Sequence, residues 1–360
     1  MELSLCMIVR DEESCLERCL LSVKEAVDEI VILDTGSRDA TRTVARRYAD
    51  RVEDYAWQDD FSAARNASFA LATKPYILWL DADDVIEDEQ RMKLLALKPR
   101  LDGSVDAVMM PYHYAHDENG AVTMTFERER IVRRDAGFRF EGIVHEAMAV
   151  GGRVLHEDIA VRHTRRHSAG RRNLELYERA RARGIPLSAR DLYYYARELD
   201  ACGETERAQR AYAAFLARPD GWAVNREDAH IERGRLLYAL GRGREGKAEA
   251  LCAMADGAPR AEALCAMGEI CLGLGELEAA EFWYRAALGS EKPGNGAAFT
   301  NPAAYGYIPA MQLCVIYDRM GKRALAEAMN ERALLERPND AAALKNQRYF
   351  AENDKNGSGR

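Results

Sequence analysis

The sequence has no long apolar run, no basic excess and no closely spaced Cys-x-x-Cys pair. A membrane-spanning helix needs about 18 or more apolar residues, and no run approaches that length, so we expect no transmembrane segment. Lys and Arg total 51 against 59 Asp and Glu, an acidic balance that argues against broad nucleic-acid affinity. The first residues lack the basic region of a secretory signal, which predicts a cytoplasmic protein.

The composition is that of a globular protein, with 48% hydrophobic and 31% charged residues. A chain of 360 residues exceeds one ordinary core, so we expect two domains. The eight cysteines lie within apolar helical or strand patterns. We interpret them as small buried thiols in a reducing compartment.

Short apolar runs alternate with helical patterns in the first part of the chain. The predicted buried strands are residues 3–9, 29–34 and 76–80, and the predicted helices are 16–23, 39–48 and 61–71. Strands and helices that alternate at these lengths form a parallel sheet with crossover helices. Ligands bind such sheets beyond the carboxyl ends of the strands.

The pattern then becomes antiparallel. Residues 105–114 and 121–126 flank Asn119-Gly120, which predicts a hairpin, and residues 129–133 predict one more strand. We therefore expect a mixed sheet, in a first domain of residues 1–165.

From about residue 170 the chain is helical and repetitive. Glycines between apolar helical stretches recur at intervals of 38, 34 and 46 residues, at Gly203, Gly241, Gly275 and Gly321. A period near 34, with small residues where helices cross, resembles the tetratricopeptide repeat, and helical hairpins of no particular family are the alternative. We predict a helical repeat domain over residues 166–350 and a flexible tail over 351–360.

An acidic turn follows the third buried strand, in the segment Trp79-Leu80-Asp81-Ala82-Asp83-Asp84. Desolvating three carboxylates without a partner is unfavourable, and a divalent cation that also binds substrate phosphates is a natural partner. The alternative is a cluster of surface acids that caps the next helix, and this alternative fits Asp84 best.

Two further charged residues lie near this edge of the predicted sheet. Asp34 ends the neighbouring strand before a turn at Gly36, and its carboxylate is a candidate acceptor for a base or a ribose. Its alternative is a capping loop without a ligand. Arg65, on the helix that leads into the acidic strand, is a candidate partner for a diphosphate or for a carboxylate.

Four segments in this order resemble the motif set of family 2 glycosyltransferases, and they are Met7–Glu13, Asp34–Ser37, Asp60–Asn66 and Leu80–Asp84. With helical repeats behind them, they are similar to the sublancin-type peptide glycosyltransferases, which modify a peptide cysteine or serine. The resemblance implies an α/β GT-A domain with a Rossmann-like mixed sheet, followed by an all-α tetratricopeptide-like domain. The first motif departs from the usual Lys-Asn-Glu, because Arg10-Asp11-Glu12 stands here.

The resemblance also assigns roles to single residues. The contacts that it implies with the donor nucleotide, a UDP-sugar, are Val9, Glu12, Asp34, Arg65 and Asp81. Val9 would line the base pocket and Asp81 would lie near the ribose. Asp83 would bind the metal, Mn²⁺ or Mg²⁺, which stabilises a diphosphate leaving group as a Lewis acid.

An inverting transfer needs a carboxylate that takes the proton of the attacking acceptor group. The candidates for this base lie in the segment Phe138–Glu146. Its Val-His-Glu end is similar to a segment of this branch of the family, which favours Glu146, with His145 and Glu141 behind it. The alternative is a glutamate that pairs with a nearby arginine. A cysteine acceptor depends less on a strong base, because thiols ionise more readily than hydroxyls.

A basic run at residues 161–167 contains His163, which related GT-A enzymes suggest as a residue that completes the metal shell. Imidazole suits Mn²⁺ better than Mg²⁺. The alternative is a solvated basic linker before the first repeat helix. The other candidates for a diphosphate pocket or an acidic acceptor are Arg165, Arg166, Arg171 and Arg172.

The leading hypothesis is a metal-dependent inverting glycosyltransferase that moves a sugar from a UDP-sugar to a Cys, Ser or Thr side chain of a peptide or protein docked by the repeats. An acceptor sugar in a lipopolysaccharide core or on a lipid is the first alternative, which the lack of an obvious basic amphipathic helix disfavours. A nucleotidyltransferase would carry a glycine-rich loop after the first strand, where residues 9–13 have no glycine. A repeat adaptor with an inactive GT-A domain would be expected to have lost some of Asp34, Arg65, Asp81 or Asp83, and all four are present. A homodimer through the repeat domain stays open.

Overall fold

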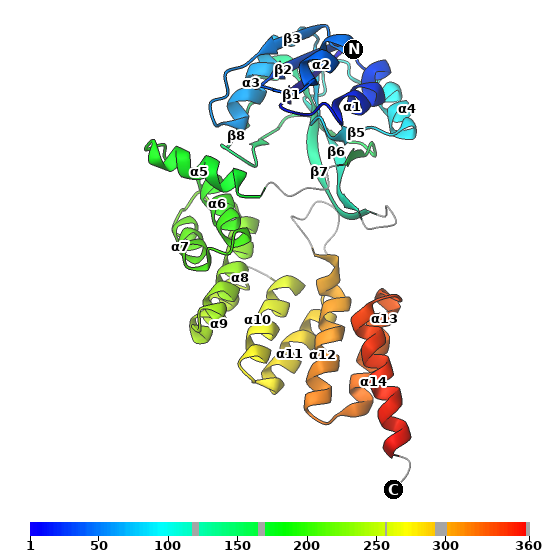
Figure 1. Ribbon diagram of the computed structural model, residues 1–360, viewed down its shortest axis with the longest axis vertical. Helices are drawn as coiled ribbons and strands as arrows, with labels where there is room; N and C mark the ends of the chain where they lie inside the picture. The colour runs from blue at the N-terminus through cyan, green and yellow to red at the C-terminus, as the bar shows by residue number, and fades with distance from the viewer. Residues whose placement is uncertain (117–121, 165–169, 256–257, 292–300, 358–360) are drawn as a thin grey trace. The chain divides into compact units, whose positions relative to one another are not determined.

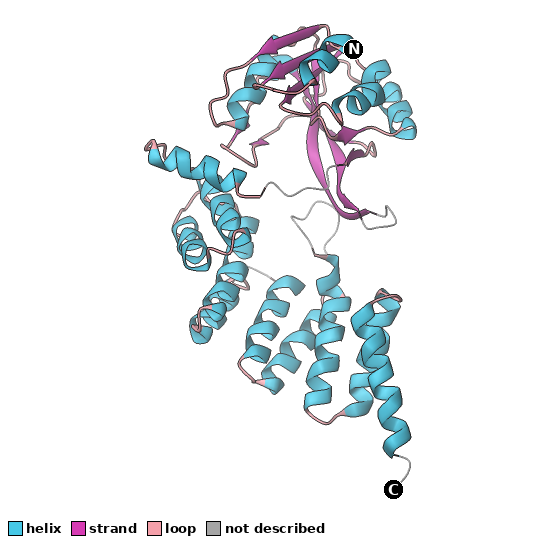
Figure 2. Cartoon of the chain, viewed as in Figure 1, coloured by secondary structure: helices cyan, strands magenta, loops and turns pink. Residues whose placement is uncertain are grey.

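The structure is a computed structural model that describes residues 1–116, 122–164, 170–255, 258–291 and 301–357 (Figure 1). The chain forms two compact units, Met1–Asp191 and Leu192–Arg360. Figure 2 shows that the strands belong to the first unit and that the second is helical. None of the helices in the described part has the length and apolar character that a bilayer crossing demands. All eight cysteines are free thiols.

A mixed sheet forms the centre of the first unit. Its parallel half contains, in spatial order, β3 (Arg51–Asp54), β2 (Glu29–Asp34), β1 (Leu3–Val9) and β4 (Tyr76–Trp79). The helices that connect these strands along the chain are α1 (Leu16–Val23), α2 (Thr41–Tyr48) and α3 (Phe61–Leu71). This arrangement confirms the predicted alternation of strands and helices. The strand β3 was not predicted, because its residues are polar and mostly exposed at the sheet edge.

Both faces of the parallel half are covered, which explains the near-continuous apolar runs. Leu5 and Met7 of β1 pack in a core with residues of α1 and α4 (Asp88–Leu97). Cys6, which points to the opposite face, packs in a second core with Phe69 of α3. Every residue of β1 except Ile8 is buried as a result.

The antiparallel part of the sheet consists of β6 (Ala107–His116) and β7 (Val122–Arg133), and β7 pairs with β4. The strand expected at 129–133 is therefore the end of one long strand, because the pairing with β6 continues along its length. Asn119-Gly120 lies outside the described residues. The remaining strands are β5 (Asp84–Val85), β8 (Phe140–Glu141), β9 (Ala147–Met148), β10 (Val154–His156) and β11 (Val161–His163).

The first unit extends to Asp191, whereas the sequence placed a domain boundary at residue 165, which lies outside the described residues. The helix α5 (Arg172–Ala182) belongs to this unit, because the Tyr177 hydroxyl donates to the Val144 carbonyl at 3.1 Å. Asp191 accepts a hydrogen bond from the N–H of Ile143 at 3.0 Å. Both contacts support the loop between β8 and β9.

The second unit consists of repeated helix pairs, as predicted. The pairs are α6 (Ala189–Ala201) with α7 (Thr205–Leu216), α8 (Ala223–Ala239) with α9 (Gly243–Cys252), α10 (Ala261–Gly273) with α11 (Leu277–Leu288), and α12 (Tyr307–Arg319) with α13 (Arg323–Glu336). The second unit begins within α6, whose residues up to Asp191 belong to the first unit. The four recurring glycines lie in the turn within each pair, with φ values of 74°, 76°, 78° and 72°. A left-handed residue at this point ends the first helix of each pair.

The last helix, α14, spans Ala341–Gly357. Helix therefore continues into residues 351–357, where the sequence predicted a flexible tail, and residues 358–360 lie outside the described part. No Pro or Gly occurs between the start of this helix and its last residue, so nothing local ends it earlier.

Replacing Gly246 with alanine is expected to destabilise the second unit. A Cβ at Gly246 would lie 2.6 Å from the carbonyl oxygen of Gly234 on α8, and this backbone atom cannot move aside unless the helices separate. Such overpacking costs about 1–3 kcal/mol, and the better helix propensity of alanine offsets about 1 kcal/mol. Denaturant unfolding should show a lower midpoint. Gly289→Ala is the control, because its nearest neighbour would lie at an ordinary 3.5 Å; equal midpoints for both variants would refute this packing argument.

Candidate active site

The carboxyl ends of β1 and β2 lie side by side, with Val9 opposite Asp34. The Val9 carbonyl accepts hydrogen bonds from the N–H of Thr35 at 2.9 Å and from its hydroxyl at 3.1 Å. Asp34 Oδ1 accepts from the N–H groups of Gly36 at 2.9 Å and Ser37 at 2.8 Å. The φ of 107° at Gly36 makes this tight turn possible. The turn therefore holds the Asp34 carboxylate at the edge of the sheet.

The two oxygens of this carboxylate have different surroundings. Oδ1 also accepts a hydrogen bond from Arg42 Nε at 3.0 Å. Oδ2 is buried and has no hydrogen-bond partner among the described residues. Burial raises the pKa of Asp34, but the bonds from Ser37, Gly36 and Arg42 outweigh it and lower that pKa. An ionised, buried oxygen of this kind is a ready acceptor for a ligand N–H or O–H.

Side chains of the first motif, Asp11 and Glu13, connect the loop after β1 with the loop after β2. The N–H of Arg38 donates to Asp11 Oδ1 at 2.7 Å, and the N–H of Ala40 donates to Glu13 Oε2 at 2.8 Å. Asp11 itself has a left-handed φ of 55°. The first motif thus has a structural function, because it fixes the loop beside the Asp34 turn.

Glu12, a predicted nucleotide contact, lies in the same loop. Its N–H donates to Thr41 Oγ1 at 2.7 Å, and its Oε2 accepts a hydrogen bond from the Cys15 thiol at 3.1 Å. Burial and the carboxylate of Glu12 raise the pKa of this thiol to about 12, so Cys15 stays protonated at neutral pH.

Arg65 connects the acidic turn with the loop between β8 and β9. Its Nη2 donates to Asp81 Oδ1 at 2.6 Å and its Nε donates to Glu146 Oε1 at 2.5 Å. The guanidinium also lies over the ring of Trp79, 4.6 Å from the centroid. Burial raises the pKa of Asp81, but Arg65 and then Arg130 lower it to about 2. Arg65 therefore pairs with carboxylates, one of the two roles that its position suggested.

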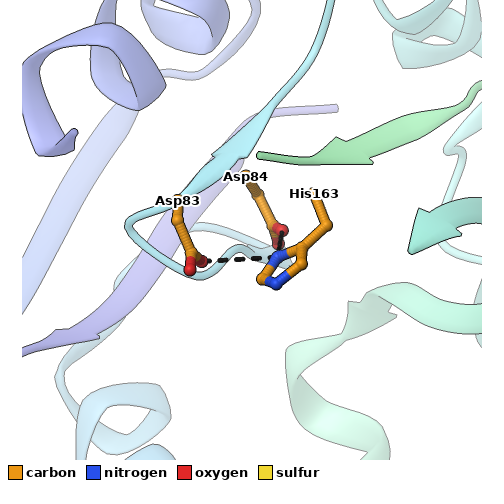
Figure 3. Close-up of side chains that lie close together, drawn as sticks. All are labelled: Asp83, Asp84 and His163. Carbon is orange, nitrogen blue, oxygen red and sulfur yellow. Dashed lines mark hydrogen bonds and ion pairs between the residues drawn. The ribbon is translucent and has the colours of Figure 1, made fainter. Parts of the chain in front are cut away.

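Asp83 and His163, the two predicted metal ligands, lie close together. Asp83 Oδ1 is 3.5 Å from His163 Nδ1, and Asp84 Oδ1 is 3.3 Å from the same nitrogen (Figure 3). One ligand atom from each of the three residues lies within 4.8 Å of the other two. Carboxylate oxygens with an imidazole nitrogen form a donor set that suits a divalent ion such as Mn²⁺.

Strand pairing causes this approach, because β11 pairs with β5 and places His163 opposite Asp84. Burial and the charge of Asp81 raise the pKa of Asp83 to about 6, although His163 lowers it. Burial lowers the pKa of His163, but Asp84 and then Asp83 raise it. The pKa values of Asp83 and His163 therefore depend on each other's charge.

Glu146, the predicted base, is a buried partner of Arg65. Burial raises the pKa of Glu146, but Arg65 lowers it, so the side chain is ionised at neutral pH. The adjacent His145 has a left-handed φ of 54°, and its carbonyl accepts a hydrogen bond from Arg190 Nε at 2.9 Å. Glu141 is exposed on β8. The structure thus contains the alternative considered for Glu146, which is an ion pair with an arginine. A catalytic role for Glu146 stays a prediction.

Arg130, a residue with no predicted role, completes this part of the molecule. Arg130 is fully buried between the rings of Trp79 and Tyr112, at 4.1 and 4.3 Å from their centroids. Its Nη1 is 3.1 Å from Asp84 Oδ2. One sequence signal could have indicated this residue: Arg130 is a basic residue directly before the apolar Ile131 within a predicted strand. A charge buried in a sheet requires a partner of opposite charge, which suggests an ion pair with one of the carboxylates.

The predicted arginine candidates after His163 have varied positions. Arg172, in the first turn of α5, lies over the ring of Phe61, 5.2 Å from the centroid. Arg171 directly precedes that helix. Arg165 and Arg166 lie outside the described residues. For all four arginines, a place in a diphosphate pocket stays a prediction.

Comparison with known proteins identifies the first unit. Residues 4–162 match the family described as Glycosyl transferase family 2. A TPR repeat-containing protein of Synechococcus elongatus is 40% identical over 146 residues, which cover 40% of this chain and 35% of that protein. The SPbeta prophage-derived glycosyltransferase SunS of Bacillus subtilis is 28% identical over 216 residues, which cover 56% of this chain and 50% of SunS. The crystal structure of S. aureus TarS superposes with a TM-score of 0.40 at 15% identity, over 68% of this chain and 54% of that chain.

The first unit therefore contains a family 2 glycosyl transferase domain, and the chain joins it to tetratricopeptide-like helical repeats. The predicted α/β domain with a mixed sheet and the predicted repeat domain are both confirmed. The chain spans half or less of the length of the curated relatives that it matches.

Proposed function

We propose that this chain is a metal-dependent, inverting glycosyltransferase that moves a sugar from a UDP-sugar to a Cys, Ser or Thr side chain of a peptide or protein. The family 2 domain and the similarity to a B. subtilis glycosyltransferase support the transfer reaction. The observation that carries the donor half is Asp34 Oδ2, a buried carboxylate oxygen without a partner among the described residues.

The donor nucleotide would bind at the ends of β1 and β2. Val9 would line the base pocket and Asp34 Oδ2 would accept a hydrogen bond from the base. A uracil ring in a nucleotide offers one N–H donor, at N3, whereas a cytosine ring offers none there. A buried acceptor at this position can therefore pair with the N3–H of the uracil ring of a UDP-sugar.

Asp83 and His163 would hold the cation, and their carboxylate and imidazole donors fit Mn²⁺. When bound, the cation supplies positive charge against the diphosphate of the donor. Arg65 would keep Asp81 and Glu146 in place beside this site, through contacts of 2.6 and 2.5 Å. Asp81 would then lie near the ribose.

A peptide or protein is the acceptor that the domain arrangement favours. Helical repeats present an extended surface, which suits a chain-like acceptor better than a small sugar. The similarity to the glycosyltransferase SunS extends over 216 residues, whereas the peptide acceptor rests on the resemblance in sequence motifs.

Asp34→Asn is expected to weaken UDP binding by about 10- to 100-fold, the effect of losing one hydrogen bond to a charged group. The asparagine oxygen can keep the bonds from Gly36 and Ser37, while its NH₂ group would replace the acceptor with a donor. Calorimetric titration of UDP, with Mn²⁺ and then with EDTA, measures this effect.

Asp39→Asn is the matched control, because Asp39 lies in the same loop but Oδ1 and Oδ2 both accept hydrogen bonds within the protein. We expect its UDP affinity to equal that of the unaltered chain. Equal affinity for Asp34→Asn and Asp39→Asn would show that Asp34 does not contact the base. Failure of the unaltered chain to bind UDP in either condition would sink the proposed function.

A further inference from the structure

Asp84 is fully buried, and each of its carboxylate oxygens already faces two donors. Oδ2 accepts a hydrogen bond from the N–H of Asp81 at 3.0 Å and lies 3.1 Å from Arg130 Nη1. Oδ1 accepts from the Tyr112 hydroxyl at 2.9 Å and lies 3.3 Å from His163 Nδ1. A carboxylate has about four lone-pair positions, so these donors fill them. Asp84 therefore has no position left for a cation, although it belongs to the acidic cluster.

The contacts among Tyr112, Asp84 and His163 determine where the protons lie. The Tyr112 hydroxyl oxygen is 2.9 Å from Asp84 Oδ1 and 2.9 Å from His163 Nδ1. A carboxylate that pairs with an arginine only accepts, so the tyrosine proton must point to Asp84. The tyrosine oxygen then faces Nδ1 with a lone pair, and an approach this close requires a proton on Nδ1. In the neutral ring, Nε2 consequently carries the lone pair.

Aromatic neighbours keep this arrangement in place. The ring of Tyr114 stacks on the His163 ring with an interplanar angle of 5° and a centroid distance of 5.3 Å. Arg130 lies between the rings of Trp79 and Tyr112, at 4.1 and 4.3 Å. The imidazole cannot turn in its plane without breaking the contacts of Nδ1, and it cannot tilt without losing the stacking on Tyr114.

We propose that Asp84 and Tyr112 are positioning residues, which hold His163 as the Nδ1–H tautomer and leave Nε2 as the ring nitrogen available to the cation of the proposed metal site. This inference rests on the metal site of the proposed function. Figure 3 shows the contacts of Asp83 and of Asp84 ending at the same ring nitrogen of His163, Nδ1, and the other ring nitrogen turned away from Asp84. A carboxylate behind a metal-binding histidine orients the ring, and its loss costs about 10- to 100-fold in metal affinity.

Calorimetric titration of Mn²⁺ into the full chain tests the proposal. Tyr112→Phe removes the bridging hydroxyl but keeps the ring beside Arg130, and we expect about 10- to 100-fold weaker Mn²⁺ binding. Tyr76→Phe is the matched control. Tyr76 is the first residue of β4, at the end of the strand away from the acidic turn. The change removes another buried hydroxyl, which donates to the Val105 carbonyl at 2.9 Å. The Mn²⁺ affinity of this variant should equal that of the unaltered chain.

A second measurement needs neither metal nor activity. Nitrogen NMR of the histidine rings in the metal-free chain reports which nitrogen of the neutral His163 ring carries the proton, and we expect Nδ1. His163→Gln identifies the signal.

The outcomes separate the two claims. Absence of Mn²⁺ binding by the unaltered chain would overturn the metal site of the proposed function, and the use of Nε2 with it. If the unaltered chain binds Mn²⁺, equal affinity in Tyr112→Phe, or a proton on Nε2, would overturn the positioning role alone and leave the proposed function standing.

Discussion

Replacing Asp83 with alanine is expected to abolish sugar transfer and to reduce UDP binding in Mn²⁺ to the level measured in EDTA. Asp83 lies in the ligand cluster with His163, whereas the carboxylate of Asp84 is already filled by donors. Removing the proposed carboxylate ligand leaves the imidazole alone, which binds a divalent ion weakly. Calorimetry with UDP and Mn²⁺, together with a transfer assay, measures both effects.

The same change is expected to leave the fold intact and to stabilise the metal-free chain. Burial and the charge of Asp81 raise the pKa of Asp83 from 3.8 to about 6, so the ionised form is unfavourable in the folded state. The folded state therefore holds this proton more tightly, and the unaltered chain loses stability as pH rises from about 4 to about 6. Asp83→Ala lacks this loss. Its gain in unfolding free energy, on the order of 1–3 kcal/mol, should be complete above about pH 6 and absent below about pH 4.

Asp88→Ala is the control for Asp83→Ala, because Asp88 is an exposed acid in the first turn of α4. It should change neither UDP binding nor transfer. Full activity in Asp83→Ala would show that the metal assignment is wrong, and unfolding of that variant at neutral pH would contradict the electrostatic argument.

Glu146→Gln is expected to slow turnover by about two to four orders of magnitude while UDP affinity stays within about twofold. The glutamine oxygen can still accept a hydrogen bond from Arg65, so the contact of Arg65 with Asp81 is kept. Only the capacity to take a proton is lost. The effect should be smaller for a cysteine acceptor than for a serine acceptor, because a thiol ionises more readily and needs less help from a base.

Glu89→Gln is the matched control, since Glu89 is an exposed glutamate in the first turn of α4 and should tolerate the change. Normal turnover in Glu146→Gln would place the base elsewhere. A loss of UDP affinity together with turnover would instead indicate that Glu146 acts by holding Arg65, which the short contact between them also permits.

Local patterns were sufficient for most of the fold. The three inner parallel strands, β1, β2 and β4, are visible as apolar runs, because they are buried on both faces. The edge strand β3 is polar and mostly exposed, so no such run reveals it. The four turn glycines identify the repeats, because a left-handed residue is required where the first helix of each pair ends. The end of the first unit, at Asp191, could not be predicted from local patterns. It depends on contacts of Tyr177 and Asp191 with the loop between β8 and β9, which no local pattern encodes.

The residues of the candidate site could likewise be predicted in part from local sequence, whereas their contacts could not. Asp34, Asp81 and Asp83 could be selected from the sequence, since each stands at or just beyond the carboxyl end of a predicted strand. The sequence could not show that the carboxylate of Asp84 accepts hydrogen bonds from donors within the protein. It also could not show that Arg65 pairs with Asp81 and Glu146. Both facts depend on side chains that approach from other strands and helices.

The sequence by itself determined which segments become strands and helices and which strand ends carry carboxylates, because periodicity, turn residues and local charge act over a few residues. Only the tertiary structure decided the partners of those carboxylates. His163 reaches Asp83 through the pairing of β11 with β5, and Arg130 reaches Asp84 from β7. Desolvation and ion pairing depend on such distant contacts, so the electrostatics of this site exist only after the sheet has assembled.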